Sequence, residues 1–519
     1  MRLITVTIVI ALALGVPAAW AVTTLAASRR FANHLAHLFL LAMLVAVAMP
    51  MILHAAAWEA TAGKFGWLAL SQTTTRSAAG FAGLVACGWI HGLYGAAIVA
   101  IATWHGTQLV PKSILQLASL DAHPLRVWWT IALPLAWPWV LAATIASAVL
   151  AATEMTVVDL YGYRTLAEEF YLLYAVAPSI TSILTTIALP LCFALALITV
   201  LLGGIRSRRH ESAAAHFQIA EPPSVGESAS PGTGPSPGIR CAAIVILFAT
   251  VMLILAIPLA GLVSKLGHEV VVDADQRTVS WSATRALREL AAAPRTFASE
   301  YQWTLILAGV TGCFATAMAW PLAAIGREHQ GCERVLDACS SVAFCIPGPL
   351  VGMLLVNFFQ LPLGGARFLY EATIVPTVLA MSVRATTIAY WIIRSGYHGI
   401  GDSVLVSAKL DAGRWRRLWR IDRPLLTPSL LLAVIGAGIV ASGDVPVTLP
   451  VAPPGVSTVG TRLFGLLHSG ARYQEAALAL WYLGLISVII IVTATHLRRR
   501  RAKIGGRSGA GVRSRAGGS

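Results

Sequence analysis

The sequence predicts an all-α polytopic membrane protein with about eleven transmembrane helices in two pseudo-symmetric halves. Three observations predict this fold class. Of the 519 residues, 57% are hydrophobic and only 12% are charged, roughly half the ~25% charged residues of a soluble domain. Apolar runs long enough to cross about 30 Å of hydrocarbon recur along the whole chain. A segment of 21 residues also occurs twice, 290 positions apart.

Eleven apolar runs are long enough to form transmembrane segments. We expect helices, because a segment in lipid must satisfy its own backbone hydrogen bonds. The first run could instead be a signal peptide, but it exceeds the ~7–15 residues of a signal core. The expected spans are 3–26, 35–57, 79–103, 135–153, 179–203, 241–264, 302–325, 335–360, 372–393, 425–443 and 476–496.

A Pro-, Gly- and Ser-rich stretch separates the two halves. Residues 207–239 contain EPPSVGESASPGTGPSPG, which cannot bury apolar surface and is typical of a flexible linker. The first half, 1–206, has five expected spans, and the second half, 240–497, has six. A basic tail at 498–519 is expected to be disordered. Two explanations account for this unequal number of spans. Either the first half truly starts at its second helix, or a further helix precedes the given start.

The distribution of Lys and Arg predicts the orientation. With the N-terminus outside, 25 of the 38 basic residues fall on the cytoplasmic side and 12 outside, while Arg384 lies within a span. The positive-inside rule therefore places the C-terminus and both copies of the repeated segment in the cytoplasm. The rule also accounts for the net charge of +15. We therefore expect the basic residues to lie beside a lipid membrane, and we expect no nucleic-acid partner.

Each copy of the repeated segment is a charged, helix-forming insert between apolar spans. An Ala-containing helix leads to Asp-Ala, a turn at His123-Pro124 or Gly413, and a Trp- and Arg-rich helix that ends at a proline. The alternative is an ordinary interfacial anchor. A duplicated register favours two equivalent docking points for a two-fold partner. The identical pairs are Ala118/Ala408, Leu120/Leu410, Asp121/Asp411, Ala122/Ala412, Arg126/Arg416, Trp129/Trp419, Ile131/Ile421, Pro134/Pro424, Leu135/Leu425 and Pro138/Pro428.

The inserts resemble the EAA loop of ABC-importer permeases, whose pattern is E-A-A-x3-G-x9-I-x-L-P. The resemblance implies a type I importer fold in which residues 116–134 and 406–424 dock into a cytoplasmic ABC ATPase dimer. The coupling residues that it implies are Ala118, Asp121, Ala122, His123, Arg126, Pro134, Ala408, Asp411, Ala412, Gly413, Arg416 and Pro424.

Two further segments narrow the resemblance. Residues 443–480, which begin GDVPVTLPVAPPG, and residues 152–175 are similar to fused permeases of the iron(III) and thiamine types. This similarity implies a bacterial inner-membrane permease with a periplasmic N-terminus that works with a periplasmic solute-binding protein. Ferric iron is the leading cargo, with thiamine, phosphonate or another small solute as the alternative. The chain has no G-x-x-x-x-G-K-[ST] loop, so we expect ATP hydrolysis on a separate subunit.

Three charged residues are candidates for the translocation pathway or for binding-protein docking. Glu154 and Asp444 are also 290 positions apart, and both fall at the outer end of the helix that follows an insert. Two facing carboxylates suit a cationic substrate or a docking contact; the alternative is a pair of solvated helix-end acids. An Arg within a span is costly, so Arg384 is expected to face the bundle interior and either gate the pathway or staple helices.

The remaining patterns argue against other function classes. None of the seven cysteines forms a C-x-x-C pair, so we expect core residues, with no metal site and no cofactor. His91 is expected to be a packed, hydrogen-bonded histidine. We find no clustered nucleophile or acid–base group, and hence predict no catalytic residues. An ion-coupled secondary transporter remains the less favoured alternative, because the spans are nearly free of Asp and Glu.

Overall fold

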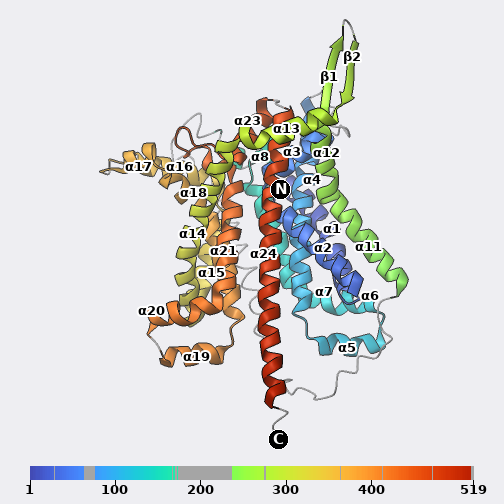
Figure 1. The fold of residues 1–519 in the computed structure, drawn as a ribbon, viewed down its shortest axis with the longest axis vertical. Helices are drawn as coiled ribbons and strands as arrows, with labels where there is room; N and C mark the ends of the chain where they lie inside the picture. Colours follow the sequence, from blue (N-terminus) through green and yellow to red (C-terminus); the bar gives the residue numbers. More distant parts are fainter. Residues whose placement is uncertain are drawn as a thin grey trace.

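The protein is an all-α bundle in the computed structural model (Figure 1). This confirms the predicted fold class of an all-α polytopic membrane protein. The residues that the structure describes are 1–28, 30–63, 76–165, 167–169, 172, 236–273, 276–362, 364–411, 413–469 and 472–515. The expected fifth span, 179–203, and most of the expected linker, 207–239, lie outside the described residues.

The first half contributes eight described α-helices and one π-helical turn. Helix α1 packs along α4, and α7 packs beside both of them. The elements are α1 (Arg2–Ala26), α2 (Arg30–Ala48), α3 (Met51–Ala62), α4 (Arg76–Gln108), α5 (Lys112–Asp121), α6 (Pro124–Val127), η1 (Trp128–Ala132), α7 (Leu133–Thr153) and α8 (Thr156–Leu160).

The second half adds a leading helix and an antiparallel hairpin to a similar order of elements. Strands β1 and β2 pair from His268 opposite Trp281 to Asp273 opposite Gln276. The elements are α11 (Pro237–Val251), η2 (Met252–Ala256), α12 (Ile257–Gly267), β1 (His268–Asp273), β2 (Gln276–Trp281), α13 (Ala283–Thr296), α14 (Ala298–Glu328), α15 (Gln330–Cys345), α16 (Gly348–Phe359), α17 (Ala366–Ala372), α18 (Val375–His398), α19 (Asp402–Asp411), α20 (Arg414–Arg417), η3 (Leu418–Asp422), α21 (Arg423–Gly443), α22 (Val445–Thr448), α23 (Val459–Ser469) and α24 (Arg472–Arg515).

Nine helices in the described part of the chain are long and apolar enough to cross a membrane, or ten if one bent pair counts as a single span. The expected total of eleven and the pseudo-symmetry of the halves remain predictions. Helix α24 continues to Arg515, so helix extends into the segment 498–519 for which we expected a disordered tail.

Two spans that we predicted as continuous helices are broken by proline. Residues 35–57 divide into α2 and α3 at Pro50, and residues 335–360 divide into α15 and α16 at Pro347, where the chain bends by 95°. Proline has no N–H to donate, its ring clashes with the preceding turn, and it drives the residue before it out of the helical region. A hydropathy average does not detect these helix breaks, because the residues on both sides of each proline are apolar.

Three π-helical turns also precede prolines. The turns η1, η2 and η3 each end two residues before a proline: Pro134, Pro258 and Pro424. Near a helix start the proline ring crowds the carbonyl four residues back, and a widened turn relieves this crowding without ending the helix. Each insert is therefore joined to the span that follows it without a loop.

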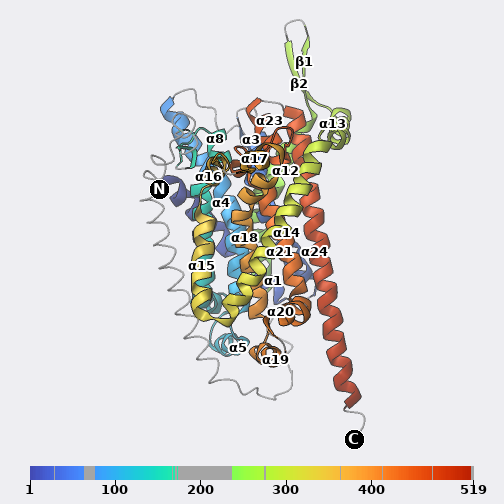
Figure 2. The same ribbon diagram turned by 90° about the vertical axis from the view of Figure 1, so that its left-hand side faces the viewer.

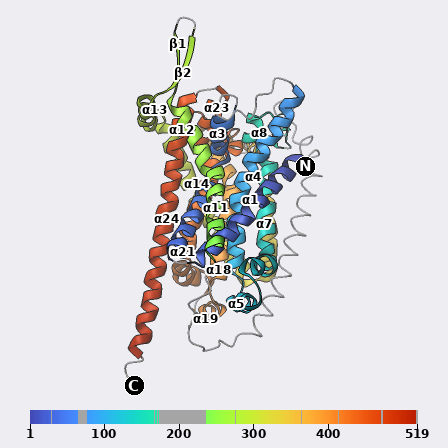
Figure 3. The ribbon, with the colours of Figure 1, turned by 90° about the vertical axis from the view of Figure 1, so that its right-hand side faces the viewer.

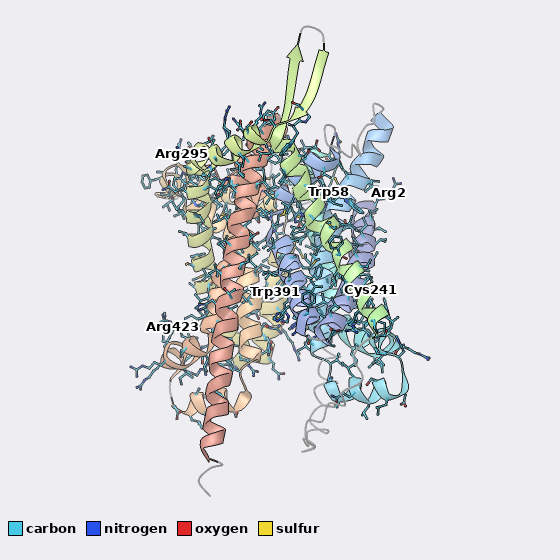
Figure 4. All side chains as sticks on the ribbon, turned by 45° about the vertical axis from the view of Figure 1, so that its right-hand side comes forward. Arg2, Trp58, Cys241, Arg295, Trp391 and Arg423 are labelled. Carbon is cyan, nitrogen blue, oxygen red and sulfur yellow. The ribbon has the colours of Figure 1, made fainter. Side chains whose placement is uncertain are left out.

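Different elements lie at the two ends of the bundle. Figures 1 and 2 show α5 and α19 together at one end, and the β1–β2 hairpin, α13 and α23 at the other. Helix α24 runs along the outer side of the bundle and extends beyond the end that carries α5 and α19 (Figures 2 and 3). In Figure 4, Arg295 and Arg423 mark these two ends, and the Arg423 side chain projects away from the bundle.

Buried apolar residues join the halves into one structure. Helix α11 belongs to the second half but packs against α1 of the first, and α12 packs against α3. A shared core near the hairpin end combines Leu53 of α3, Leu262 of α12, Leu463 of α23 and Tyr482 of α24. Separate cores form around α1, α4 and α7, and around α14, α18 and α21.

Close packing of α14 on α21 depends on a glycine, which gives a matched test. A Cβ on Gly312 would lie 2.4 Å from the carbonyl oxygen of Val434, whereas a Cβ on Gly309 of the same helix would meet no atom within 4 Å. We expect Gly312→Leu to lower the free energy of unfolding by about 1–3 kcal/mol through overpacking. The change Gly309→Leu should not lower it, because the new side chain meets no atom and leucine is the better helix former. Thermal unfolding in detergent measures both, and equal effects would contradict this packing.

Candidate functional site

The two inserts have the same structure in the same register. We define the first insert as residues 112–132 and the second insert as residues 402–422. Helices α5 and α19, α6 and α20, the turns η1 and η3, and the spans α7 and α21 begin and end at positions that all differ by 290. The duplicated sequence thus folds into a duplicated helix–turn–helix whose second helix continues into a membrane span.

Local chemistry explains the turn in each insert. Helix α5 ends because Ala122 is extended, with φ −141° and ψ 149°. His123 precedes Pro124 and is therefore held out of the helical region. Its ring nitrogen Nδ1 lies 3.4 Å from the backbone N–H of Leu125, which it caps. In the second insert Gly413 occupies the same capping position before α20.

Both inserts expose apolar and acidic side chains at the same end of the bundle. Leu120 is 80% exposed and its counterpart Leu410 is 85% exposed. Asp121 and Asp411, the last residues of α5 and α19, are exposed beside them. Large exposed leucines at duplicated positions are typical of a surface that a partner covers.

The other predicted coupling residues are distributed around this surface. Ala118 and Ala122 are half-buried, and Ala408 is buried. Ala412 lies outside the described residues. The exposed members are His123, Arg126, Pro134, Gly413, Arg416 and Pro424.

A shallow pocket opens on the second insert. Its volume is about 400 Å³. Ser403, Ser407 and Asp411 of α19 line one side, and Ile421 of η3 lines the other. The pocket therefore offers hydroxyl and carboxylate groups beside an apolar wall, within the segment that the sequence predicts to dock the partner.

Two of the three candidate pathway residues, Glu154 and Asp444, lie at the far ends of the helices that follow the inserts. Asp444 caps α21 and is buried. Arg384 of α18 places Nη1 3.6 Å from Oδ2 of Asp444 and donates a hydrogen bond from Nη2 to the carbonyl of Ile346 at 3.0 Å. Arg384 thus faces the interior, and its partner, which the sequence left open, is Asp444.

Glu154 occupies the equivalent position at the end of α7 and is held differently. Its carboxylate accepts hydrogen bonds from the backbone N–H groups of Thr156 at 2.7 Å and Val157 at 2.9 Å. His91 of α4 places Nε2 3.5 Å from the carboxylate, and its Nδ1 bonds to the carbonyl of Cys87 at 2.8 Å. His91 is thus a packed histidine as expected, and it also faces the acid.

Burial excludes the alternative of solvated helix-end acids, since Glu154 is 8% and Asp444 7% exposed. Burial raises the pKa of the Asp444 carboxyl; the charge of Arg384 opposes this shift and the charge of Glu154 adds to it. Burial alone would also raise the pKa of Glu154, but the hydrogen bond and charge of His91, with the Thr156 and Val157 bonds, hold it below its usual value. Glu154 and Asp444 are thus close enough for an electrostatic interaction.

Metal chemistry has little basis in the described part of the chain. No group of three or more His, Cys, Asp or Glu side chains that could hold a metal ion occurs among the described residues. Six of the seven cysteines are described, and they are free thiols.

The fold and these sites define a multi-pass membrane protein with a duplicated, exposed insert. No protein-family model matches the chain. The chain is 24% identical over 205 residues to the "putative 2-aminoethylphosphonate transport system permease protein PhnV" of Salmonella typhimurium, an alignment that covers 38% of this chain and 76% of the relative. The protein of the same description from Salmonella choleraesuis is 25% identical over 185 residues, 34% of this chain and 68% of the relative. These similarities confirm, over part of the chain, the resemblance to transport permeases.

The buried pair of Arg384 and Asp444 gives a stability prediction. We expect Arg384→Met to lower the free energy of unfolding by about 3 kcal/mol, because it leaves a buried carboxylate without its partner. Adding Asp444→Leu should recover most of the loss, since a buried pair can be replaced by apolar side chains at little cost. Thermal unfolding in detergent measures both. Arg367, in an exposed pair with Glu371, is the control, and Arg367→Met should leave the midpoint unchanged.

Proposed function

We propose that this chain is the fused permease subunit of an ATP-binding-cassette importer that moves a solute from a periplasmic binding protein to the cytoplasm. The observation that carries the proposal is the pair of inserts, identical in register and exposed at one end of the bundle. The similarity to a transport-system permease supports it independently. Two equivalent inserts match a dimeric ATPase, because each subunit of the dimer offers one copy of the same binding surface.

The geometry provides a route for mechanical coupling. From Pro124 to Thr153, and from Arg414 to Gly443, the helix is continuous over 30 residues, which corresponds to about 45 Å. Each of these helices begins within an insert and ends at a buried carboxylate, Glu154 or Asp444. A displacement of the inserts by ATP-driven closure would therefore move both acids together and change access to the space between them.

The proposal also includes an orientation of the bundle in the membrane, which follows from the distribution of Lys and Arg. The insert end carries most of the Lys and Arg residues and is the cytoplasmic side. The end with the β1–β2 hairpin, α13 and α23 then faces the periplasm and receives the binding protein.

The cargo that the similarity favours is a phosphonate and not ferric iron, because the relatives are described as 2-aminoethylphosphonate permeases. A zwitterionic aminophosphonate needs both signs of charge in its path. Arg384 and His91 could face the phosphonate group, and Glu154 and Asp444 could face the amine. Ferric iron and thiamine are the competing cargoes, and a competition assay separates them.

The docking role of the inserts is tested by charge reversal. We expect a tagged chain to co-purify with the ATPase from its genomic neighbourhood, and Asp121→Arg combined with Asp411→Arg to abolish this association, since both acids are exposed at equivalent positions of the two inserts. Co-purification and ATPase activity are the measurements.

Leu287→Arg is the matched control, because Leu287 is also strongly exposed but lies on α13 at the opposite end. This variant should retain the ATPase. Failure of the wild-type chain to bind any ATPase, with uptake driven by an ion gradient alone, would instead indicate a secondary transporter.

The cargo is tested in proteoliposomes that contain the chain with its ATPase and binding protein. We expect ATP-dependent uptake of labelled 2-aminoethylphosphonate, and a loss of at least about tenfold in the rate for Arg384→Met, the effect of removing one charge-assisted contact. ATP-dependent uptake of ferric iron or thiamine that excess aminophosphonate does not reduce would rule out the phosphonate assignment.

A further inference from the structure

The two inserts are equal in backbone but differ in how they are attached to the bundle. At the base of the second insert, Arg417 and Asp422 are buried. At the corresponding positions 290 residues earlier, the first insert has Val127 and Ala132, which are also buried. A charged attachment and an apolar one therefore occupy the same place in the two halves.

We define the anchor cluster as Glu328, Tyr397, Arg417 and Asp422. Arg417 donates a hydrogen bond from Nη2 to Oε1 of Glu328, the last residue of α14. Its Nε lies 3.6 Å from Oδ2 of Asp422. Tyr397, near the end of α18, donates its hydroxyl hydrogen to the same Asp422 oxygen at 3.1 Å. The anchor cluster thus ties the second insert to two membrane helices at once.

The equivalent of Tyr397 in the first half is Thr107, whose hydroxyl bonds to the carbonyl of Trp104 within its own helix α4. Trp128 and Ala132 of the first insert pack into the apolar core around α1 and α4. Apolar contacts are non-directional, whereas the charged hydrogen bonds of the anchor cluster fix an orientation. Partial desolvation strengthens them further.

A second charged contact stiffens the same end of the second half. Arg394 of α18 binds Glu333 at 2.8 Å and Asp337 at 3.0 Å, both on α15. The position 290 residues before Arg394 is Trp104, an apolar residue. Helix α18, one of the two helices to which the second insert is anchored, is therefore itself held to α15 by charged contacts.

We propose that the second insert is a rigid element that the anchor cluster holds to the bundle, and that the first insert is a compliant one. Glu328, Tyr397, Arg417 and Asp422 are positioning residues in this assignment, because they hold the docking surface without forming it. The consequence for transport rests on the proposed function. A displacement of the ATPase would be transmitted almost fully through the second insert to α14, α18 and α21, while the first insert adjusts its position to the ATPase.

The structural part of the inference is tested on the purified chain alone, without ATPase. In hydrogen–deuterium exchange in nanodiscs, we expect protection factors for amides 414–422 to exceed those for amides 125–132 by about tenfold or more, the factor of one charge-assisted hydrogen bond. Arg417→Met should remove the difference, and Val127→Met at the matched position should leave amides 414–422 unchanged. Should Arg417→Met fail to fold, Tyr397→Phe removes a single hydroxyl and should lower protection at the same amides. Equal protection in the wild-type inserts, or unchanged protection in the variant that folds, would overturn the assignment.

The functional part is tested in the complex with the ATPase. We expect Arg417→Met, or Tyr397→Phe if it does not fold, to retain ATPase binding but to lower the number of solutes moved per ATP several-fold, whereas Val127→Met has little effect. Equal losses in both variants would overturn the difference between the inserts. If the wild-type chain binds no ATPase, the proposed function fails while the exchange measurement still decides the structural assignment.

Discussion

A buried carboxylate at the end of a long helix is the constraint on which the arrangement of this bundle depends. A charge in a low-dielectric interior is tolerated only when it is paired and hydrogen-bonded. Asp444 is paired with Arg384, and Glu154 accepts hydrogen bonds from backbone N–H groups and faces His91. These pairings fix how α21 sits against α18 and how α7 sits against α4, and so determine where the ends of both long helices lie.

The prolines give the same helices a continuous mechanical path. Pro134 and Pro424 lie in the first turn of α7 and α21, and the chain accommodates each with a widened turn instead of a break. Pro50 and Pro347 themselves lie outside the helical region, with ψ 148° and 135°, and there the helix does end. The same residue type thus connects an insert rigidly to its span in one context and breaks a span in another, according to its place in the helix.

The two inserts share one backbone but are attached to the bundle through different side chains. The backbone of the inserts repeats at a constant offset, yet Arg417 and Asp422 replace Val127 and Ala132 at the base. The helices of the two inserts nevertheless begin and end at equivalent positions. The bonds that the charged residues form change only the strength and direction of attachment. A permease with two unequal inserts would engage a symmetric ATPase with one firm and one adaptable contact.

The sequence by itself determined the class of protein and the location of the inserts, because hydropathy and an internal repeat are properties of local composition. It also identified Glu154, Asp444 and Arg384 as unusual charges. Only the tertiary structure decided that Arg384 pairs with Asp444, that His91 faces Glu154, and that Glu328 anchors an insert 89 residues away. It likewise decided that two apolar spans are broken at proline. Partners distant in sequence are chosen by the packing of helices and by the need to pair buried charge, and neither is encoded in the order of apolar and polar residues along a single helix.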